Sequence, residues 1–384
     1  MRITASLSLV AGVVIYAASG TSVNILPHQV TAYVAALHLN DAQAGIAAMC
    51  ETAALALMTL VAVILPSRHE RLIAVVAPLL AAAAQLGSIV APNLVALCAL
   101  RTVVGAGCGA AGCVAARSLG TSAAPAQAFG ISNGVAAVIS GLFLAGVPYF
   151  PSTSPGIRVF VPLGVLAVLL GIAGAYTPAR HYLEPVAAPA GAAGSSPASI
   201  RALALLFATT LLYVPLGGIW TFSVQQGTQL GLSERQVGVM LTWMIPAGLI
   251  GGAVAAWIQR RVGLFSALCL AGGAAILTCL LIATAHTPLL FGLSFAWYAA
   301  TYMFALSVLQ AAGVTADASG RLSAVMFGMT LVGCALGSYL VGLLLDSGAS
   351  SIIGGGGMLL SAIAAVLALW ATRISMPRQE MPVP

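Results

Sequence analysis

Two ionisable residues, Glu51 and Arg101, interrupt long apolar stretches of the sequence. Glu51 follows Asp41 by ten residues, and Arg101 follows Asn93 by eight. At a helical rise of about 1.5 Å per residue, Glu51 lies roughly 15 Å from the start of its segment and Arg101 roughly 12 Å from the start of its own. A charge at that depth in lipid costs about 2.5–3.5 kcal/mol on insertion scales. The similar depth therefore predicts that the two side chains face a partner or a water-filled cavity.

Such a pair could bind and release a proton. Burial favours the uncharged form of a carboxyl group, whereas a neighbouring guanidinium group favours the charged form. A conformational change that alters this balance would let a proton on or off. We therefore interpret Glu51 as a proton-coupling residue and Arg101 as its charge partner. The residues leave open a second interpretation, a permanent structural ion pair between the two segments.

The motifs do not support enzyme chemistry. Residues 107–112 match the G-x-G-x-x-G spacing of a dinucleotide site, but they lie inside an apolar span and no acid follows about 20 residues later. His69-Glu70 lacks the second His of a zinc protease. The seven cysteines have neither C-x-x-C spacing nor a His cluster beside them. We therefore expect no catalytic site, no metal and no cofactor.

The composition predicts a protein embedded in lipid. Of the 384 residues, 60% are hydrophobic and 6% are charged, whereas soluble domains carry roughly 25% charged residues. So few polar side chains cannot cover a globule in water. The 14 basic residues are all Arg and lie mostly in short loops, so the net charge of +6 indicates membrane orientation and not nucleic-acid binding.

Twelve apolar segments are long enough to span a bilayer, which takes about 20 residues. Residues 178–200 are rich in Pro, Ala, Gly and Ser, a composition typical of a linker. The chain thus divides into a first unit (1–177), a cytoplasmic linker (178–200) and a second unit (201–384). The expected segments are 6–36, 42–65, 72–91, 93–116, 127–149, 157–177, 201–228, 235–258, 263–284, 288–312, 322–345 and 351–372.

The arginines predict the orientation. If the N-terminus is cytoplasmic, eleven of the 14 Arg lie in inside loops and tails, and only Arg158 and Arg235 lie outside. Because basic loops stay on the cytoplasmic side, we expect a multi-pass protein of the inner (plasma) membrane with both termini in the cytoplasm.

The two units repeat each other. Leu37–Ile46 aligns with Leu230–Val239 at an offset of 193 residues, which places Gly45 on Gly238. This similarity indicates an internal duplication of a six-segment unit. Glycines with G-x-x-x-G spacing further predict close helix packing at positions 105/109, 130/134, 248/252 and 333/337.

With these motifs, the chain resembles transporters of the major facilitator superfamily over nearly its whole length. The resemblance rests on residues 40–45 and 233–238, on the basic turns 67–71 and 259–263, and on the pattern Arg101-x-x-x-Gly105-x-Gly107-x-Gly109. It implies an all-α membrane protein with twelve transmembrane helices in two pseudo-symmetric six-helix bundles. The bundles would open a shared cavity alternately to each side of the membrane.

Two features depart from the family pattern. Pro66 and Gln259 stand where the family has an acidic residue, which argues against a gating pair that uses this acid. Segment five contains Gly146-Val147-Pro148, an imperfect version of the family's antiporter signature, and this tilts the interpretation slightly toward export.

The resemblance also implies which side chains face the substrate, because helices one, four, seven and ten line the cavity in this family. Aromatic rings and amides on these segments suit a small organic solute with a ring or several hydroxyl groups. The substrate-binding candidates are Tyr16, Asn24, His28, Gln29, Tyr213, Trp220, Gln225, Gln226, Trp297, Tyr298, Tyr302 and Gln310.

Together these features predict a monomeric secondary active transporter that moves a small organic solute and is driven by protons, with export slightly favoured. One alternative is a proton-coupled uptake symporter for an organic anion, in which Arg101 binds the anion. A more distant alternative is a membrane receptor with a transporter-like fold.

Overall fold

The computed structural model of the protein describes residues 2–64, 69–120, 122, 125–152, 154–177, 200–317 and 321–373. These residues form helices and no strands. They contain eleven candidate membrane spans, in agreement with a multi-pass membrane protein. The predicted linker, apart from Ile200, lies outside the described residues.

Most helices follow the predicted segments to within a few residues. The first half of the chain contains α1 (Arg2–Ser19), α2 (Thr21–Asn24), α3 (Leu26–Leu37), α4 (Asp41–Ile64), α5 (Glu70–Gly87), η1 (Ser88–Val90), α6 (Leu94–Gly120), α7 (Pro125–Gly146), η2 (Val147–Tyr149) and α8 (Pro155–Gly174). The second half contains α9 (Ile200–Thr221), α10 (Ser223–Gln229), α11 (Glu234–Leu241), α12 (Met244–Ala283), α13 (Pro288–Ala316), α14 (Arg321–Asp346) and α15 (Ser350–Arg373).

The first predicted segment, 6–36, is broken into α1, α2 and α3. Ile25, which joins α2 to α3, has φ −109° and ψ 17° and lies outside the helical region. Pro27 follows in the first turn of α3, where a helix does not need its missing N–H. The break leaves Thr21 and Ser22 buried, and Ser22 becomes important for the site described below.

A second break divides α12. This helix has 40 residues, which at about 1.5 Å per residue is roughly twice the 30 Å thickness of the hydrocarbon core. Gly263 interrupts it with φ 81° and ψ 168°, a conformation that suits only glycine. The predicted segments eight and nine therefore meet at a glycine within the predicted basic turn.

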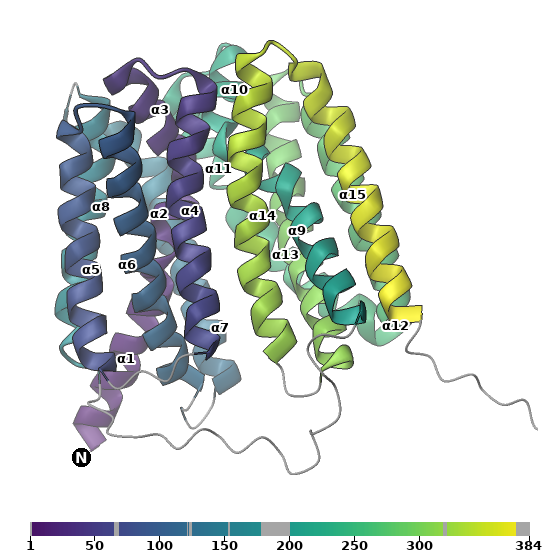
Figure 1. The fold of residues 1–384 in the computed structure, drawn as a ribbon, viewed down its shortest axis with the longest axis horizontal. Helices are drawn as coiled ribbons and strands as arrows, with labels where there is room; N and C mark the ends of the chain where they lie inside the picture. The colour runs from purple at the N-terminus through teal and green to yellow at the C-terminus, as the bar shows by residue number, and fades with distance from the viewer. Residues whose placement is uncertain are drawn as a thin grey trace, which may run out of the picture.

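The two halves of the chain lie side by side. In Figure 1 the purple and blue helices of the first half occupy the left side and the teal to yellow helices of the second half occupy the right. α4 and α14 pack against each other between them (Figure 1). The start of α1 and the end of α15 both lie at the lower end of the molecule.

Three polar contacts between the halves gather at the opposite, upper end, which we call the closed end. They are Gln225 Nε2 to Asp41 Oδ1 (2.8 Å), Asn40 Nδ2 to Asp346 Oδ2 (3.3 Å) and the ion pair of Arg158 Nη1 with Glu234 Oε2 (3.7 Å). Residues from α4, α8, α10, α11 and α14 thus join the halves where α3 and α10 lie in Figure 1.

The repeated glycines also lie at the closed end. A Cβ on Gly45 of α4 would lie 2.5 Å from the carbonyl oxygen of Ser338 on α14. A Cβ on Gly238 of α11 would overlap the carbonyl oxygen of Leu144 on α7. Gly45 and Gly238, aligned by the sequence repeat, therefore make equivalent backbone contacts with the opposite half.

The predicted packing role of the other glycines is correct in part. Added Cβ atoms at Gly105, Gly109, Gly333 and Gly337 would collide with neighbouring helices. At three positions the prediction is wrong, because an added Cβ meets no atom within 4 Å. These positions are Gly130, Gly134 and Gly252. Their G-x-x-x-G spacing puts them on one helix face without bringing a partner helix close.

Candidate functional site

Glu51 on α4 and Arg101 on α6 form a fully buried pair. Both side chains are 0% exposed, and Arg101 Nε lies 3.6 Å from Glu51 Oε2. The helices approach closely here because Gly105, one turn after Arg101, packs on the Glu51 carbonyl oxygen without a side chain between them. The depth deduced from the sequence thus matches a real contact, whereas its role in proton coupling stays a prediction.

The remaining nitrogens of Arg101 bind two amides. Its Nη1 donates to Gln29 Oε1 and its Nη2 donates to Gln85 Oε1, both at 2.9 Å. The guanidinium carbon lies 5.3 Å from the ring centroid of Phe160 and 5.9 Å from that of Tyr33. Carbonyl dipoles and aromatic faces therefore stabilise a cation that has no access to water.

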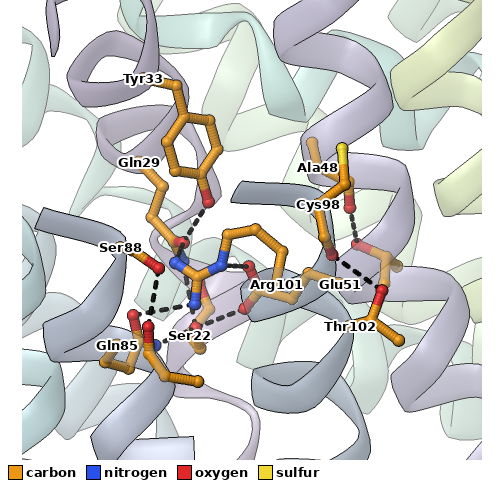
Figure 2. A network of polar contacts seen from close by, with 12 residues as sticks. Ser22, Gln29, Tyr33, Ala48, Glu51, Gln85, Ser88, Cys98, Arg101 and Thr102 are labelled. Carbon is orange, nitrogen blue, oxygen red and sulfur yellow. Dashed lines mark hydrogen bonds and ion pairs between the residues drawn. The ribbon is translucent and has the colours of Figure 1, made fainter. Parts of the chain in front are cut away.

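Ser22 connects these amides to the carboxylate. The Ser22 hydroxyl donates to Glu51 Oε1 and accepts from Gln29 Nε2 at 3.1 Å and from Gln85 Nε2 at 2.9 Å. Gln29 Nε2 also donates to the Ser22 carbonyl oxygen at 2.6 Å. Five side chains shown in Figure 2 thus close a ring from Arg101 through Gln29 and Gln85 to Ser22 and Glu51.

This buried network balances one positive against one negative charge. Its members come from α2, α3, α4, α5 and α6, and all are buried. Buried charges are tolerated when they are paired and hydrogen-bonded. Removal or neutralisation of one charge leaves the other uncompensated, so the network is sensitive to the protonation of Glu51.

A cluster of aromatic rings lies in the second half, on α9 and α13. Trp220 stacks on Tyr298 with ring centroids 6.3 Å apart and an interplanar angle of 16°. Tyr213 contacts Tyr302 edge-on at 4.8 Å, and Tyr298 lies 6.1 Å from Tyr302. Four predicted substrate residues are therefore neighbours.

The aromatic cluster touches the first half through Trp220. Its indole N–H donates to the carbonyl oxygen of Val23 at 3.2 Å. Val23 directly follows Ser22, so the break in the first segment lies between the charge network and the aromatic cluster.

The fold is shared with solved transporter structures. A bacterial homolog of the human lysosomal transporter Spinster, in an inward-facing and unoccupied conformation, matches with a TM-score of 0.71 and 17% identity over 97% of this chain and 98% of the other. The nucleoside transporter NupG matches with a TM-score of 0.73 and 13% identity over 97% and 100% of the two chains. The chain has the major facilitator fold.

A third structure with this fold is a D-xylose-proton symporter, with a TM-score of 0.70 and 11% identity over 94% of this chain and 96% of the other. All three are membrane transporters and not enzymes. Searches with family models and against curated proteins find no match to this chain. What this chain shares with the three transporters is therefore the major facilitator fold.

Within the major facilitator fold of this chain, three further predicted substrate residues from the first segment face α7. They make an edge-on ring contact or a hydrogen bond: Tyr16 with Phe129 (5.4 Å between centroids), Asn24 Nδ2 with Ser140 Oγ (2.9 Å) and His28 Nε2 with the Leu144 carbonyl oxygen (3.1 Å). Asn24 is exposed and His28 is buried. Among the described residues, these three lie against α7 and not against the aromatic cluster, which touches the first segment at Val23.

The other candidates are spread along the second half. Gln225 joins the closed end, and Gln226 donates to the Ile282 carbonyl oxygen at 3.0 Å. Trp297 is 39% exposed and donates to the Ala274 carbonyl oxygen of α12 at 3.3 Å. Gln310 is half-buried near the lower end of α13. Gln29, also predicted to bind substrate, accepts a hydrogen bond from Arg101. Substrate binding by these residues stays a prediction.

Two members of the network, Ser22 and Gln85, are absent from the sequence-based candidates. Gln85 can be found from the sequence, because it is the sole amide within the apolar stretch 72–91. An amide there needs a buried partner for the same reason that a charge does. Ser22 gave no comparable signal, since its approach to Glu51 depends on the break before α3.

Proposed function

We propose that this protein is a proton-coupled secondary transporter of a small organic solute. In this proposal its chain crosses the membrane twelve times in two six-helix bundles, residues 1–177 and 201–384, joined by the linker 178–200. The observation that carries the proposal is the buried network of Glu51 and Arg101 within a fold that secondary transporters share. The substrate would bind between the bundles and be exposed alternately to each side.

The network links proton binding to conformation. A proton on Glu51 would leave the positive charge of Arg101 without its counter-charge, at a position with no exposure to water. The protonated state is therefore favoured in a conformation that lets water or an anion approach Arg101. A conformational equilibrium that binds protons differently in its two states can use a proton gradient as its driving force.

The same electrostatics keep the alternative of anion symport open. An anionic solute at Arg101 could replace the negative charge that Glu51 loses on protonation. In the present conformation, however, both Nη atoms of Arg101 are bound by Gln29 and Gln85. We therefore favour a solute that binds elsewhere. The imperfect antiporter signature at residues 146–148 places export slightly ahead of uptake in this proposal.

The aromatic cluster supports a solute with a ring. Trp220 and Tyr302 are half-buried members of this cluster, and Tyr302 lies against both Tyr213 and Tyr298. A nucleoside transporter shares the fold, so nucleosides belong in a first panel together with aromatic amines and hydroxylated rings. The panel is scored by the rise in unfolding temperature of the purified protein.

Replacement of Tyr302 by Leu is expected to weaken binding of a ring-bearing solute by about 2- to 13-fold, because an aromatic contact is worth about 0.5–1.5 kcal/mol. Tyr302→Phe keeps the ring and is expected to bind within about threefold of the parent. Titration of the unfolding temperature with the solute measures both values. Equal loss in the two variants would contradict ring stacking at Tyr302.

Replacement of Glu51 by Gln is expected to abolish accumulation driven by a pH gradient, because an amide cannot exchange the proton. Exchange of labelled for unlabelled solute across the membrane should persist. Proteoliposomes with and without an imposed gradient separate the two activities. The matched control is Glu70→Gln, which removes a carboxylate of a partly exposed ion pair within the first half worth about 0–1 kcal/mol. Gradient-driven accumulation by Glu51→Gln equal to that of the parent would rule out coupling at this residue.

The orientation proposed for this transporter follows from the arginines. The start of α1 and the end of α15 lie at the same end of the molecule (Figure 1), and a chain with an even number of crossings requires this. With most of the Arg residues on that side, we propose a monomer in the inner membrane with both termini in the cytoplasm.

A further inference from the structure

The break between α1 and α3 contacts three parts of the molecule through three consecutive residues. Ser22 binds Glu51 on α4, and the Val23 carbonyl accepts from Trp220 on α9. Asn24 donates to Ser140 on α7. α2 has only four residues and ends at the non-helical Ile25. A small displacement of Ser22 is therefore not resisted by the hydrogen bonds of a long helix.

The hydrogen bonds around Ser22 all run in one direction. Arg101 donates to the carbonyl oxygens of Gln29 and Gln85, and both amide nitrogens donate to the Ser22 hydroxyl. The hydroxyl in turn donates its single proton to Glu51. Tyr33 fixes the direction at one amide, because its hydroxyl donates to Gln29 Oε1 at 2.7 Å. The chain of donors thus starts at the cation and ends at the carboxylate.

A proton on Glu51 conflicts with this direction. A hydroxyl oxygen accepts at most two hydrogen bonds, and Ser22 already accepts two. A protonated Oε1 would need to donate to an oxygen that has no free lone pair. A protonated Oε2 would point toward Nε of Arg101, which is itself a donor. Protonation of Oε1 therefore breaks a hydrogen bond of Ser22. Protonation of Oε2 brings two donors, its own O–H and the Arg101 Nε–H, against each other.

The groups that face Glu51 from the packed helices allow few other responses. α6 contributes Arg101 and the Cys108 thiol, and α3 contributes the Tyr33 hydroxyl. On α14, the residues that pack with Leu55 and Ala56 of α4 are the apolar Leu331, Phe327 and Val332. Among the described residues, Ser22 is the hydrogen-bond partner of the Glu51 carboxyl group, so its hydrogen bond changes when the proton binds Oε1.

We propose that Ser22 is a positioning residue that transmits the protonation state of Glu51 to Trp220 and the aromatic cluster. When Glu51 is charged, Ser22 holds the break so that the Val23 carbonyl meets the Trp220 indole. When Glu51 is protonated, Ser22 moves, the Val23 carbonyl moves with it, and the stack of Trp220 on Tyr298 loses its support. The inference rests on the proposed proton coupling and adds the route by which the second half senses it.

Fluorescence of Trp220 tests this route. The chain has five tryptophans, so replacement of Trp243, Trp257, Trp297 and Trp370 by Phe leaves Trp220 as the reporter. In this background, purified in lipid nanodiscs, the emission maximum is followed from acid to alkaline pH. We expect a shift of several nanometres with a single midpoint, because the indole loses its hydrogen bond to Val23.

Three variants assign the response. Glu51→Gln and Ser22→Ala should each abolish the shift, whereas Ser22→Thr, which restores a hydroxyl, should recover it. Ser140→Ala is the matched control, because it removes the partner of Asn24 and leaves every hydrogen bond of Ser22 in place. It should shift as the parent does. Elution of each variant as a single species, with a cooperative thermal unfolding transition like that of the parent, shows that it is folded.

The outcomes separate this route from the proposed function. A shift that persists in Ser22→Ala but disappears in Glu51→Gln would overturn the role of Ser22 and leave proton coupling intact. Absence of any shift in the parent background, with gradient-driven transport retained, would do the same. A shift that persists in Glu51→Gln, together with unchanged gradient-driven transport, would remove both the coupling role and the route.

Discussion

Replacement of Arg101 by Met is expected to destabilise the folded protein by about 3–5 kcal/mol, the usual cost of breaking a buried ion pair. Methionine fills much of the volume, but it leaves the Glu51 carboxylate fully buried without a counter-charge. It also leaves the carbonyl oxygens of Gln29 and Gln85 without donors from Arg101. The loss should be smaller in acid, where Glu51 can take up a proton and become neutral. The unfolding temperature of the purified protein in detergent measures the effect.

A second substitution identifies the cause of this loss. Arg101→Met combined with Glu51→Gln contains no buried charge, so it should recover most of the stability that Arg101→Met loses. Replacement of a complete buried pair by neutral residues is often close to neutral in stability. If the double variant were no more stable than Arg101→Met at alkaline pH, the loss would come from packing, and the ion pair would not be the stabilising contact.

The contact between Glu51 and Arg101 can be predicted because helical rise converts sequence spacing into depth. Both segments start at the same side, and two charges at similar depth in an apolar medium have a strong energetic reason to meet. The same reasoning applied to amides would have included Gln85. Helix ends were predictable because they coincide with changes in composition, as at Asp41–Ile64 for the expected segment 42–65.

The break at Ser22 and the join at Gly263 could not be predicted in the same way. Hydropathy averages over about 20 residues, so a four-residue helix within an apolar stretch leaves no trace in it. The segment 6–36 reads as continuous for this reason. Conversely, the two arginines at 259–263 predict a loop. In the structure the helix is interrupted there at Gly263 alone. Local backbone conformation decides both cases, and composition does not specify it.

Substitution of Gly45 and Gly238 by Ala is expected to move the protein away from the state closed at the upper end. Each added Cβ would collide with a backbone carbonyl oxygen of the opposite half, and neither carbonyl can rotate away as a side chain would. Overpacking of this kind costs about 1–3 kcal/mol, which corresponds to a roughly 5–150-fold change in a conformational equilibrium. The collision exists only while the halves touch, so the opposite state is unaffected.

A crosslink across the closed end measures this equilibrium. Asn40 and Asp346 lie in hydrogen-bond contact there, and Asn40→Cys with Asp346→Cys, in a background without the seven native cysteines, forms a disulfide only while this end is closed. The rate of oxidation should fall when Gly45 and Gly238 are both replaced by Ala. Gly134→Ala and Gly252→Ala are the matched controls, because their Cβ atoms meet no atom within 4 Å, and they should crosslink at the parent rate.

The result also tests what the internal repeat does. Gly45 contacts Ser338 and Gly238 contacts Leu144, so each copy of the motif supplies a smooth surface on which the other half closes. If both contacts hold the same closed state, each single substitution should slow the crosslink and the double substitution should slow it by about the product of the two effects. An unchanged crosslinking rate in the double variant would mean that the upper end closes without these contacts. The repeated glycines would then be left over from the duplication, without a role in the transport cycle.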